Sequence, residues 1–273
     1  MDVERILVAV FLVLVICELL WSKRLGRKVY SAGDTLANFS VAVVGALLKP
    51  LALAWTYTFL TFVEPYQLFR LEASALNIVG TFILVEFAYY WYHRMLHEVP
   101  AMWTLHHTHH SSPWFNFTTA VRLNWISKFV SPLYFMPLTL LGFSPLWIAL
   151  SLGLGLLYQL FLHTESLPKL GWFEGKLLNT PSAHRVHHGS NSAYIDKNYG
   201  GALIIWDRLF GTYQPETEPV RYGVTTGFMG HNPLAIQLQP LFRLLRGELR
   251  RERQLAEQRE PATVNTRDAG EPA

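Results

Sequence analysis

Long apolar runs recur along the first 163 residues of the chain, and polar, turn-rich sequence follows them. The runs cover residues 6–21, 35–63, 74–92 and 129–163. Lys49-Pro50 interrupts the second run, which is therefore either one bent helix or two half-helices. Gly and Pro at 141–145 divide the last run into a helical hairpin. This pattern predicts an all-α integral membrane protein with four to five transmembrane helices.

The pattern also predicts three regions. Residues 1–72 hold the N-terminal transmembrane helices, and residues 73–240 form a catalytic domain of membrane helices and a helical cap over 165–239. Residues 241–273 are a basic amphipathic segment and tail. Residues 233–251 alternate apolar and Arg positions near helical spacing, which predicts a helix lying on the membrane surface. Residues 261–273 have the composition of a disordered end.

Composition supports a membrane protein and excludes some functions. Only 16% of the residues are charged, against roughly 25% in soluble domains. The net charge is +3 and no basic stripe is interleaved with aromatics, so nucleic-acid binding has no support. Cys17 is the single cysteine, which rules out an internal disulfide framework and a thiolate metal cluster. Any metal must have nitrogen and oxygen ligands.

Basic residues predict the orientation. Lys23, Arg24, Arg27 and Lys28 directly follow the first run, which places that side in the cytoplasm of a bacterial cell or at the endoplasmic reticulum. We expect the first run to be a retained membrane helix, because no signal-cleavage pattern follows it. If the second run crosses once, the histidine-rich stretch 93–110 and the cap both lie on the cytoplasmic side.

Three histidine clusters are the main chemical signal. They are His93-x-x-x-His97 and two H-x-x-H-H triplets, His106/His109/His110 and His184/His187/His188. Positions i, i+3 and i+4 share one helical face, so each cluster can aim two or three imidazoles at one point. Eight imidazoles exceed the needs of one metal ion, which usually takes about four. The clusters predict two metals, and iron, zinc, copper and nickel all suit such ligands.

Several other residues are candidates for the same site. His163 ends the last apolar run and is expected to complete the ligand set. Glu86 shares a helical stripe with His93 and His97; it either accepts a hydrogen bond from a ligating histidine or pairs with Arg94 or a tyrosine. Asp196 and Asn198 follow the third cluster and are expected to support its histidines.

Two histidines are expected to have no ligand role. His107 lies about 100° round the helix from His106, and His231 is isolated beside Asn232-Pro233 and is expected at the surface. Zinc-protease, serine-hydrolase and phosphate-loop motifs do not occur. A membrane metal-binding or transport protein and a histidine-ligated haem protein are the alternatives of other classes. Transport is less expected, because transporters usually hold ligands near the bilayer midplane.

The histidine motifs resemble those of the fatty acid hydroxylase/sterol desaturase superfamily of membrane di-iron oxygenases. The stretches that carry the resemblance are "YYWYHRMLHEVPAMWTLHHTHHSS", "LLYQLFLHTE" and "LNTPSAHRVHHGSNSAYIDKNYGGALIIWDRLFGTY", and they are most similar to the ether-lipid-cleaving branch. Where some relatives have a further histidine, this chain has Gln159. The resemblance implies iron ligands at His93, His97, His106, His109, His110, His163, His184, His187 and His188.

The resemblance also implies the reaction and its partners. We expect two iron ions, O2 as co-substrate and hydroxylation of a C–H bond in a membrane lipid. Hydroxylation beside the oxygen of an O-alkylglycerol would release a fatty aldehyde and a glycerol moiety. A fatty acyl or sterol hydroxylase or desaturase of the same superfamily is the alternative. The chain needs an external electron donor; tetrahydrobiopterin serves the ether-lipid branch, and cytochrome b5 or a ferredoxin-type donor serves others.

Overall fold

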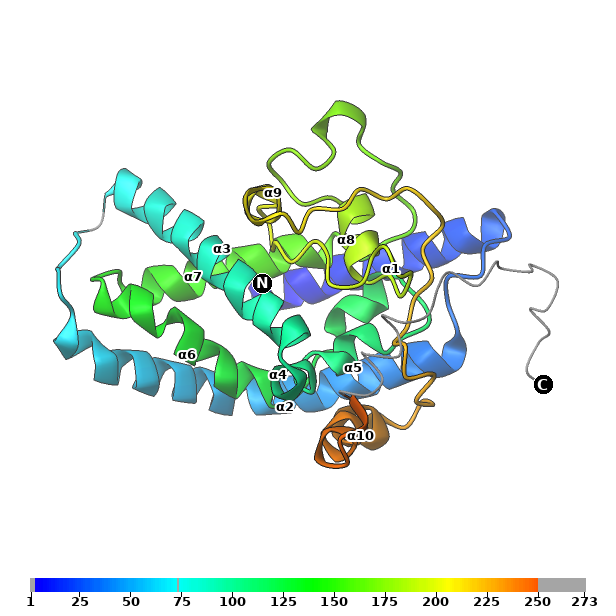
Figure 1. Ribbon diagram of the computed structural model, residues 1–273, viewed down its shortest axis with the longest axis horizontal. Coiled ribbons are helices and arrows are strands. Elements are labelled where there is room, and N and C mark those ends of the chain that lie inside the picture. Colours follow the sequence, from blue (N-terminus) through cyan, green and yellow to red (C-terminus); the bar gives the residue numbers. More distant parts are fainter. Residues whose placement is uncertain (1–2, 73, 250–273) are drawn as a thin grey trace.

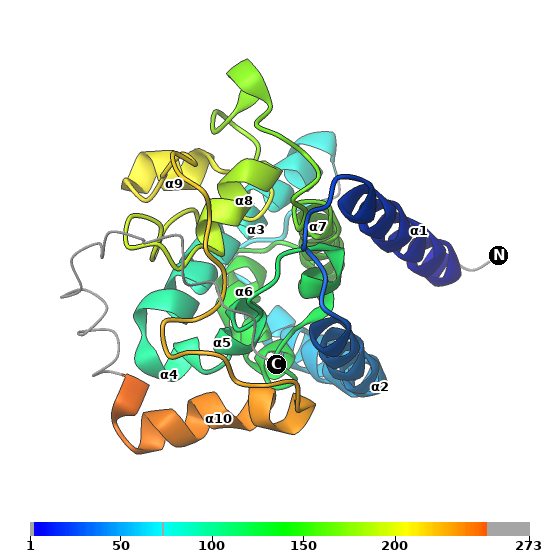
Figure 2. The ribbon, with the colours of Figure 1, turned by 90° about the vertical axis from the view of Figure 1, so that its right-hand side faces the viewer.

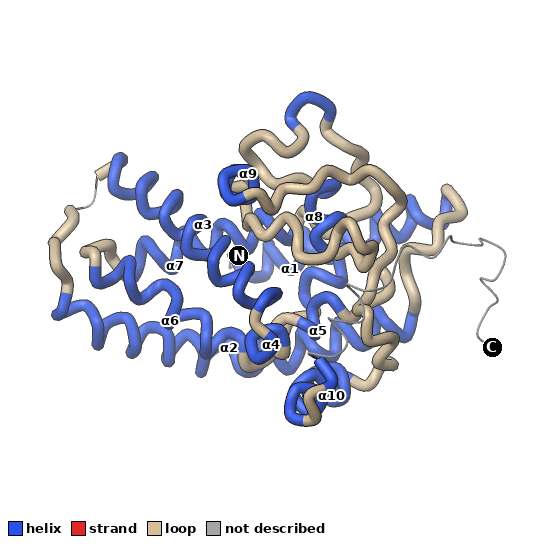
Figure 3. Tube along the Cα trace, viewed as in Figure 1, coloured by secondary structure: helices blue, strands red, loops and turns tan. Residues whose placement is uncertain are grey.

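The computed structural model describes residues 3–72 and 74–249, and within these ranges it is helical with no β-strand (Figure 3). Helix α1 covers Val3–Arg24 and α2 covers Ala32–Val63. The α2 helix is continuous through Pro50. The second apolar run is therefore one helix, because the flanking apolar turns continue although Pro50 lacks a backbone N–H donor.

Four helices form an elongated bundle along the long axis of the molecule (Figure 1). Helix α3 covers Ala75–Glu98, α6 covers Ser127–Leu140 and α7 covers Pro145–Leu160. Helix α2 packs mainly against α6, and α3 packs against both α7 and α6. The buried residues between α3, α6 and α7 form the bundle core: Val85, Tyr89, Tyr92, Leu96, Phe135, Leu138 and Ile148.

Two helices are long and apolar enough to cross a membrane, residues 4–24 and 32–66. The other predicted spans are helical, but shorter or less apolar. Helix α6 has 14 residues and is about 21 Å long at 1.5 Å per residue, less than the roughly 30 Å hydrocarbon layer. Helix α7 has 16 residues. The hairpin of the last apolar run is confirmed as a pair of helices.

Helix α1 lies beside the N-terminal half of α2 on the outside of the molecule (Figure 2). Glu4 forms an ion pair with Lys49 at 2.7 Å, and the rings of Phe11 and Phe39 are 6.4 Å apart. Near its other end, Glu18 accepts a hydrogen bond from the backbone N–H of Phe117 at 3.0 Å. Helix α1 is therefore antiparallel to the first half of α2 and reaches the loops of the cap.

Short helices and long loops form the cap at the other end of the bundle (Figure 1). Helix α3 begins at its cap residue Ser74 and extends six residues beyond the predicted span, carrying His93 and His97 into this region. The remaining short elements are η1 Glu64–Tyr66, α4 Pro100–Trp103, α5 His107–His110, η2 Phe117–Val121, η3 Gly171–Phe173, α8 Pro181–His187 and α9 Ile205–Phe210. The short elements α8 and α9 fall within the range 165–239 that was predicted as a cap.

Helix α10, Pro233–Leu245, covers most of the segment that was predicted to lie on a membrane surface. Leu234, Leu238, Phe242 and Leu245 are exposed on it, so an apolar face is open to the outside, as a surface helix requires. The predicted disordered end, 261–273, lies outside the described residues.

Candidate metal centre

The cap brings nine histidines together in two neighbouring groups. Within each group, one ring nitrogen from each histidine lies within 4.8 Å of the corresponding nitrogens of all the others. One group contains His93, His97, His106, His110 and His187, and the other contains His109, His163, His184 and His188. These are the nine histidines that the sequence predicted to meet.

Four separate segments deliver these side chains. The last two turns of α3 carry His93 and His97. The short helix α5 and its cap residue His106 carry the second cluster, and α8 with its cap residue carries the third. His163 lies just past the end of α7. The Thr180 side chain accepts from the Ala183 backbone N–H at 3.2 Å and starts α8, with Pro181 at its first position.

Each H-x-x-H-H triplet divides its imidazoles between the two groups. His106 and His110 belong to the group of five, whereas His109, between them, belongs to the group of four. The third cluster has the reverse arrangement: His184 and His188 are in the group of four and His187 is in the group of five. Positions i and i+4 thus point to one group and i+3 to the other. Each triplet aims two imidazoles at one point, not three.

Backbone carbonyl groups fix the orientation of three rings. The Nδ1–H of His93 donates to the Tyr199 carbonyl at 2.7 Å, and that of His187 donates to Lys197 at 3.0 Å. His163 donates in the same way to Gln159 at 2.8 Å. Because Nδ1 carries the proton, Nε2 of each ring presents a lone pair. This is the usual way in which outer hydrogen bonds prepare a histidine for a metal.

Burial keeps the cluster in the neutral form that binds metal ions. Burial lowers the pKa of His106, His109 and His110 well below the ordinary value, and the neighbouring imidazoles lower it further. The same causes act on the third cluster, His184, His187 and His188. Burial also lowers the pKa of His163 to about 4.

The donor set fits two metal ions. Nε2 of His163 lies 3.1 Å from Nε2 of His109 and 3.0 Å from Nε2 of His184. Nε2 atoms of three further rings are buried without a hydrogen-bond partner among the described residues: His110, His187 and His188. Buried polar atoms are normally paired. Cations shared by converging lone pairs would satisfy them, with five imidazoles available for one ion and four for the other.

Asp196 lies beside a histidine ring, whereas the side-chain N–H groups of Asn198 donate to backbone carbonyl groups. Asp196 Oδ1 is 3.6 Å from Nδ1 of His97. The Asn198 side chain instead donates to the carbonyl groups of Ala183 and Gln214 at 2.9 and 2.8 Å. Both residues have φ near +57°, a left-handed conformation that Asp and Asn tolerate better than most residues. Asn198 therefore holds the backbone of α8.

The hydrogen bonds of the Glu86 carboxylate go to none of the three predicted partners, a ligating histidine, Arg94 or a tyrosine. Its Oε2 accepts from the backbone N–H groups of Ala202 and Leu203 at 2.6 and 2.9 Å, while Arg94 donates to Glu98 and Tyr90. The prediction of a bond to a ligating histidine, Arg94 or a tyrosine is wrong. The loop before α9 places two N–H donors over the carboxylate, which ties that loop to the bundle.

His107, His231 and Gln159 occupy distinct positions. His107 is fully buried outside both groups, with Nε2 3.3 Å from the Thr226 hydroxyl. His231 is exposed, as expected. Gln159 is buried near the group of four and accepts from the Tyr89 hydroxyl at 2.7 Å. It stands one turn before His163, and its backbone carbonyl is the acceptor that orients that ring.

Histidines of the two groups line two cavities, and these two cavities have no lining residue in common. One, of about 430 Å³, is mostly apolar, lies against α2, α6 and α7, and is lined by His93, His106, His109, His163 and His184. The other, of about 420 Å³, lies within the cap and is lined by His97, His110, His187 and His188. Its other lining residues include the polar Ser190, Ser192, Asp196, Thr225 and Thr226. Each histidine group therefore faces both cavities, and the second, the cap cavity, differs by the Ser and Thr side chains in its lining.

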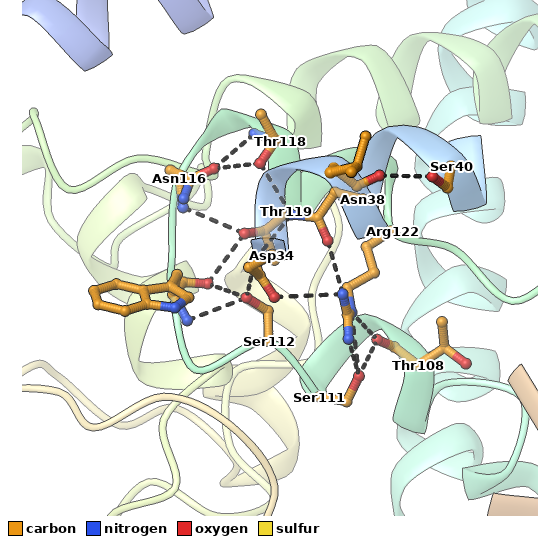
Figure 4. A network of polar contacts seen from close by, with 12 residues as sticks. Asp34, Asn38, Ser40, Thr108, Ser111, Ser112, Asn116, Thr118, Thr119 and Arg122 are labelled. Carbon is orange, nitrogen blue, oxygen red and sulfur yellow. Dashed lines mark hydrogen bonds and ion pairs between the residues drawn. The ribbon is translucent and has the colours of Figure 1, made fainter. Parts of the chain in front are cut away.

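A buried polar network behind the second cluster was not foreseen from the sequence (Figure 4). Arg122 is fully buried; its Nε donates to the Thr108 carbonyl at 2.9 Å, and Nη2 donates to the Ser111 hydroxyl at 2.9 Å. Its Nη1 reaches Asn38 at 2.9 Å and Asp34 at 3.5 Å on α2. Arg122 thus ties the helix that carries His109 and His110 to α2.

A second unforeseen group, Asp207, holds the loop that orients His93. Asp207 Oδ1 accepts from the Tyr199 backbone N–H, and Oδ2 accepts from that of Gly200, both at 2.7 Å. Burial raises the pKa of Asp207 to about 6. The carboxyl group fixes Tyr199, whose carbonyl accepts from His93. The sequence has no motif that links Asp207 to the histidines.

Apolar helices that carry a buried, imidazole-rich centre define a helical protein with a candidate dimetal site. Residues 78–212 match the sequence profile of the fatty acid hydroxylase family. These residues contain all nine clustered histidines. The chain belongs to the fatty acid hydroxylase superfamily, as the sequence motifs indicated.

Curated relatives include alkylglycerol monooxygenases. The chain is 49% identical over 159 residues to the one from Xenopus tropicalis, covering 58% of this chain and 35% of the relative. It is 41% identical over 235 residues to the human one, covering 85% and 52%. It is 29% identical over 255 residues to the ornithine lipid hydroxylase OlsE of Rhizobium tropici, covering 89% and 75%.

The chain spans from about a third to half of the length of the alkylglycerol monooxygenases that it matches. The matched part includes the region of the histidine clusters. No solved structure matches the chain.

Proposed function

We propose that the protein is a membrane di-iron monooxygenase that hydroxylates a lipid C–H bond with O2, and that its substrate is an O-alkylglycerol ether lipid. The observation that carries the proposal is the placement of nine buried or half-buried imidazoles, in groups of five and four, between two cavities. The names of the relatives, alkylglycerol monooxygenase and ornithine lipid hydroxylase, support this reaction class.

The histidines would hold two iron ions, which supply O2 activation and C–H oxidation when bound. Insertion of one oxygen atom of O2 into a C–H bond of the carbon beside the ether oxygen gives a hemiacetal. Two electrons and two protons reduce the second oxygen atom to water. The hemiacetal collapses to a fatty aldehyde and a free glycerol hydroxyl. The Tyr199, Lys197 and Gln159 carbonyl groups keep the rings of His93, His187 and His163 in the ligating orientation.

We propose that the two cavities bind different molecules. The apolar cavity, with Val41, Ala42, Leu156 and Leu160 in its lining, takes the lipid chain, because apolar walls bind a hydrocarbon and exclude water. The cap cavity, with its Ser and Thr side chains, gives the external reductant access to the other side of the centre. Tetrahydrobiopterin is the first donor to test.

We also propose that the protein is a multi-pass membrane protein with its histidine centre on the cytoplasmic side. Helices α1 and α2 are the strongest candidates to cross the bilayer. Lys23, Arg24, Arg27 and Lys28 between them support a cytoplasmic location for that turn. The exposed apolar face of α10 would rest on the same leaflet.

The test is aerobic incubation of the purified, iron-loaded protein with 1-O-hexadecylglycerol and tetrahydrobiopterin. We expect hexadecanal and glycerol in equal amounts, with O2 consumed in step. The His109→Ala protein is the inactive control, because it lacks one ligand of the group of four. Oxidation of acyl lipids or sterols with no aldehyde from the ether lipid would refute the substrate while retaining the reaction class. No oxidation of any lipid would refute the function.

A further inference from the structure

The apolar cavity carries an unexpected pair of positive charges. Apart from the histidines, Lys49 of α2 and Lys128 of α6 are the charged residues in its lining, and the lining includes no carboxylate. Ionisable side chains among apolar helices are costly and usually mark a functional path. A neutral lipid would bring no anionic group into the cavity to pair with the two ammonium groups.

Lys128 is held in place, and its ammonium group keeps N–H donors for a ligand. Its Nζ donates to the Gly45 carbonyl of α2 at 2.7 Å, which uses one of three ammonium donors. Position 45 has room for this contact because it is glycine: a Cβ there would lie 3.2 Å from Nζ. On the preceding turn, the Trp125 ring N–H donates to the Val41 carbonyl at 3.0 Å. The start of α6 is therefore fixed against α2 with an ammonium group at the cavity wall.

Lys49 has a replaceable partner. It pairs with Glu4 at 2.7 Å, and the two side chains are 54% and 73% exposed. Both side chains of the pair lie on the outer surface of α1 and α2. A ligand anion can therefore reach Lys49 and take the place of the Glu4 carboxylate. The neighbouring Val43, Leu47 and Leu51 are exposed apolar residues of α2, so a lipid can approach this rim.

We propose that Lys49 and Lys128 bind the phosphate group of a single-chain ether lipid, so that the preferred substrate is an O-alkylglycerol phosphate rather than a neutral alkylglycerol. This inference rests on the proposed ether-lipid function and specifies the headgroup. The phosphate lies between the two ammonium groups, and the ether region lies toward the histidines in the same cavity.

Headgroup binding would also determine which carbon is oxidised. The ether-adjacent carbon lies at a fixed number of bonds from the phosphate, whatever the length of the alkyl chain. An anchor at the headgroup therefore selects the same carbon in chains of different lengths, whereas an anchor at the chain end would not. The two lysines are thus specificity-determining residues.

The test measures binding to the detergent-solubilised, iron-free protein, so that it does not depend on turnover. The two probes are 1-O-hexadecylglycerol 3-phosphate and neutral 1-O-hexadecylglycerol, and the readout is the ratio of their Kd values. We expect the wild-type protein to prefer the phosphate by at least about tenfold, since charge-assisted contacts are the strong ones. Lys128→Gln and Lys49→Gln should each reduce the ratio, and the double variant should bring it close to one.

Controls keep the result specific. Lys23→Gln removes an exposed lysine away from the cavity and should retain the preference, and Lys128→Arg should restore most of it. A wild-type ratio near one, or a preference that survives in K49Q/K128Q, would overturn the inference. Glycerol 3-phosphate or inorganic phosphate that competes as well as the lipid would show an anion site that does not select a lipid. If the iron-loaded protein oxidises no ether lipid, the function fails, while the ratio still tests the lysines.

Discussion

Replacement of Arg122 by Met tests whether the buried polar network supports the second histidine cluster. Arg122 and Asp34 are 0% and 1% exposed in their side chains, and their closest atoms are 3.5 Å apart. The methionine removes the charge and the bonds to Thr108, Ser111 and Asn38. Asp34 keeps its bonds from Asn38 at 3.1 Å and Ser112 at 2.8 Å, but loses its counter-charge.

The expected loss of stability is large. Removing one partner of a buried ion pair costs about 3–5 kcal/mol, because the other charge remains buried. In a chain of this size each kcal/mol lowers Tm by about 2–4 °C, so R122M should lower Tm by about 6–20 °C. The Thr108 carbonyl also loses its hydrogen-bond donor, the Arg122 Nε–H. Because Thr108 directly precedes His109, this change should loosen the His109 ring and lower the amount of bound iron.

The assay is thermal unfolding of the iron-free protein in detergent, followed by iron titration. Arg246→Met is the matched control, since Arg246 is 74% exposed and lies 3.9 Å from Glu248, and its Tm should change by about 4 °C at most. The double variant D34N/R122M should be more stable than the sum of the single losses predicts. A Tm for R122M equal to that of the control, or strict additivity, would refute the role of the network.

Three further predictions concern the centre. His109→Ala should reduce bound iron, whereas His107→Ala should retain it, since His107 lies outside both groups; equal loss by metal analysis would contradict this. Burial lowers the pKa of His163 to about 4, below its ordinary 6.5, so the contribution of this group to stability is complete above pH 6.5 and falls by about 3 kcal/mol as the pH drops toward 4. His163→Ala should therefore lose less Tm than the wild type between pH 6.5 and 4, and an equal loss would contradict this. Burial raises the pKa of Asp207 to about 6, so the contribution of this group acts in the opposite direction and is lost as the pH rises through 6. Asp207→Asn should lower Tm at pH 5, and by less at pH 8.

The apolar pattern predicted the helices well because each run is long and periodic. It could not predict how they pack. The first run predicted a membrane helix without saying what it packs against, and the Glu4–Lys49 and Phe11–Phe39 contacts place α1 beside the first half of α2. Long-range contacts of this kind leave no trace in local hydropathy.

The histidines were also predictable, but the division of each triplet was not. Spacing places positions i, i+3 and i+4 on one face, yet His109 faces a different group from His106 and His110. Helix α5 is a single turn that begins after His106, so the regular-helix geometry does not apply there. Glu86 illustrates the same limit: its partners are backbone N–H groups at positions 202 and 203, which no side-chain pattern encodes.

The carboxylate of Glu18 has a consequence for the order in which the chain assembles. Its backbone donors are Phe117 and Glu165, which follow it by 99 and 147 residues. Ribosomes add about 5–20 residues per second, so α1 would wait about 7–30 s before its last partner is made. By then α2, α3, α6 and α7 have all been synthesised. The Glu18 end of the first helix to leave the ribosome is therefore among the last parts to be fixed in place, although its Glu4 end meets α2 early.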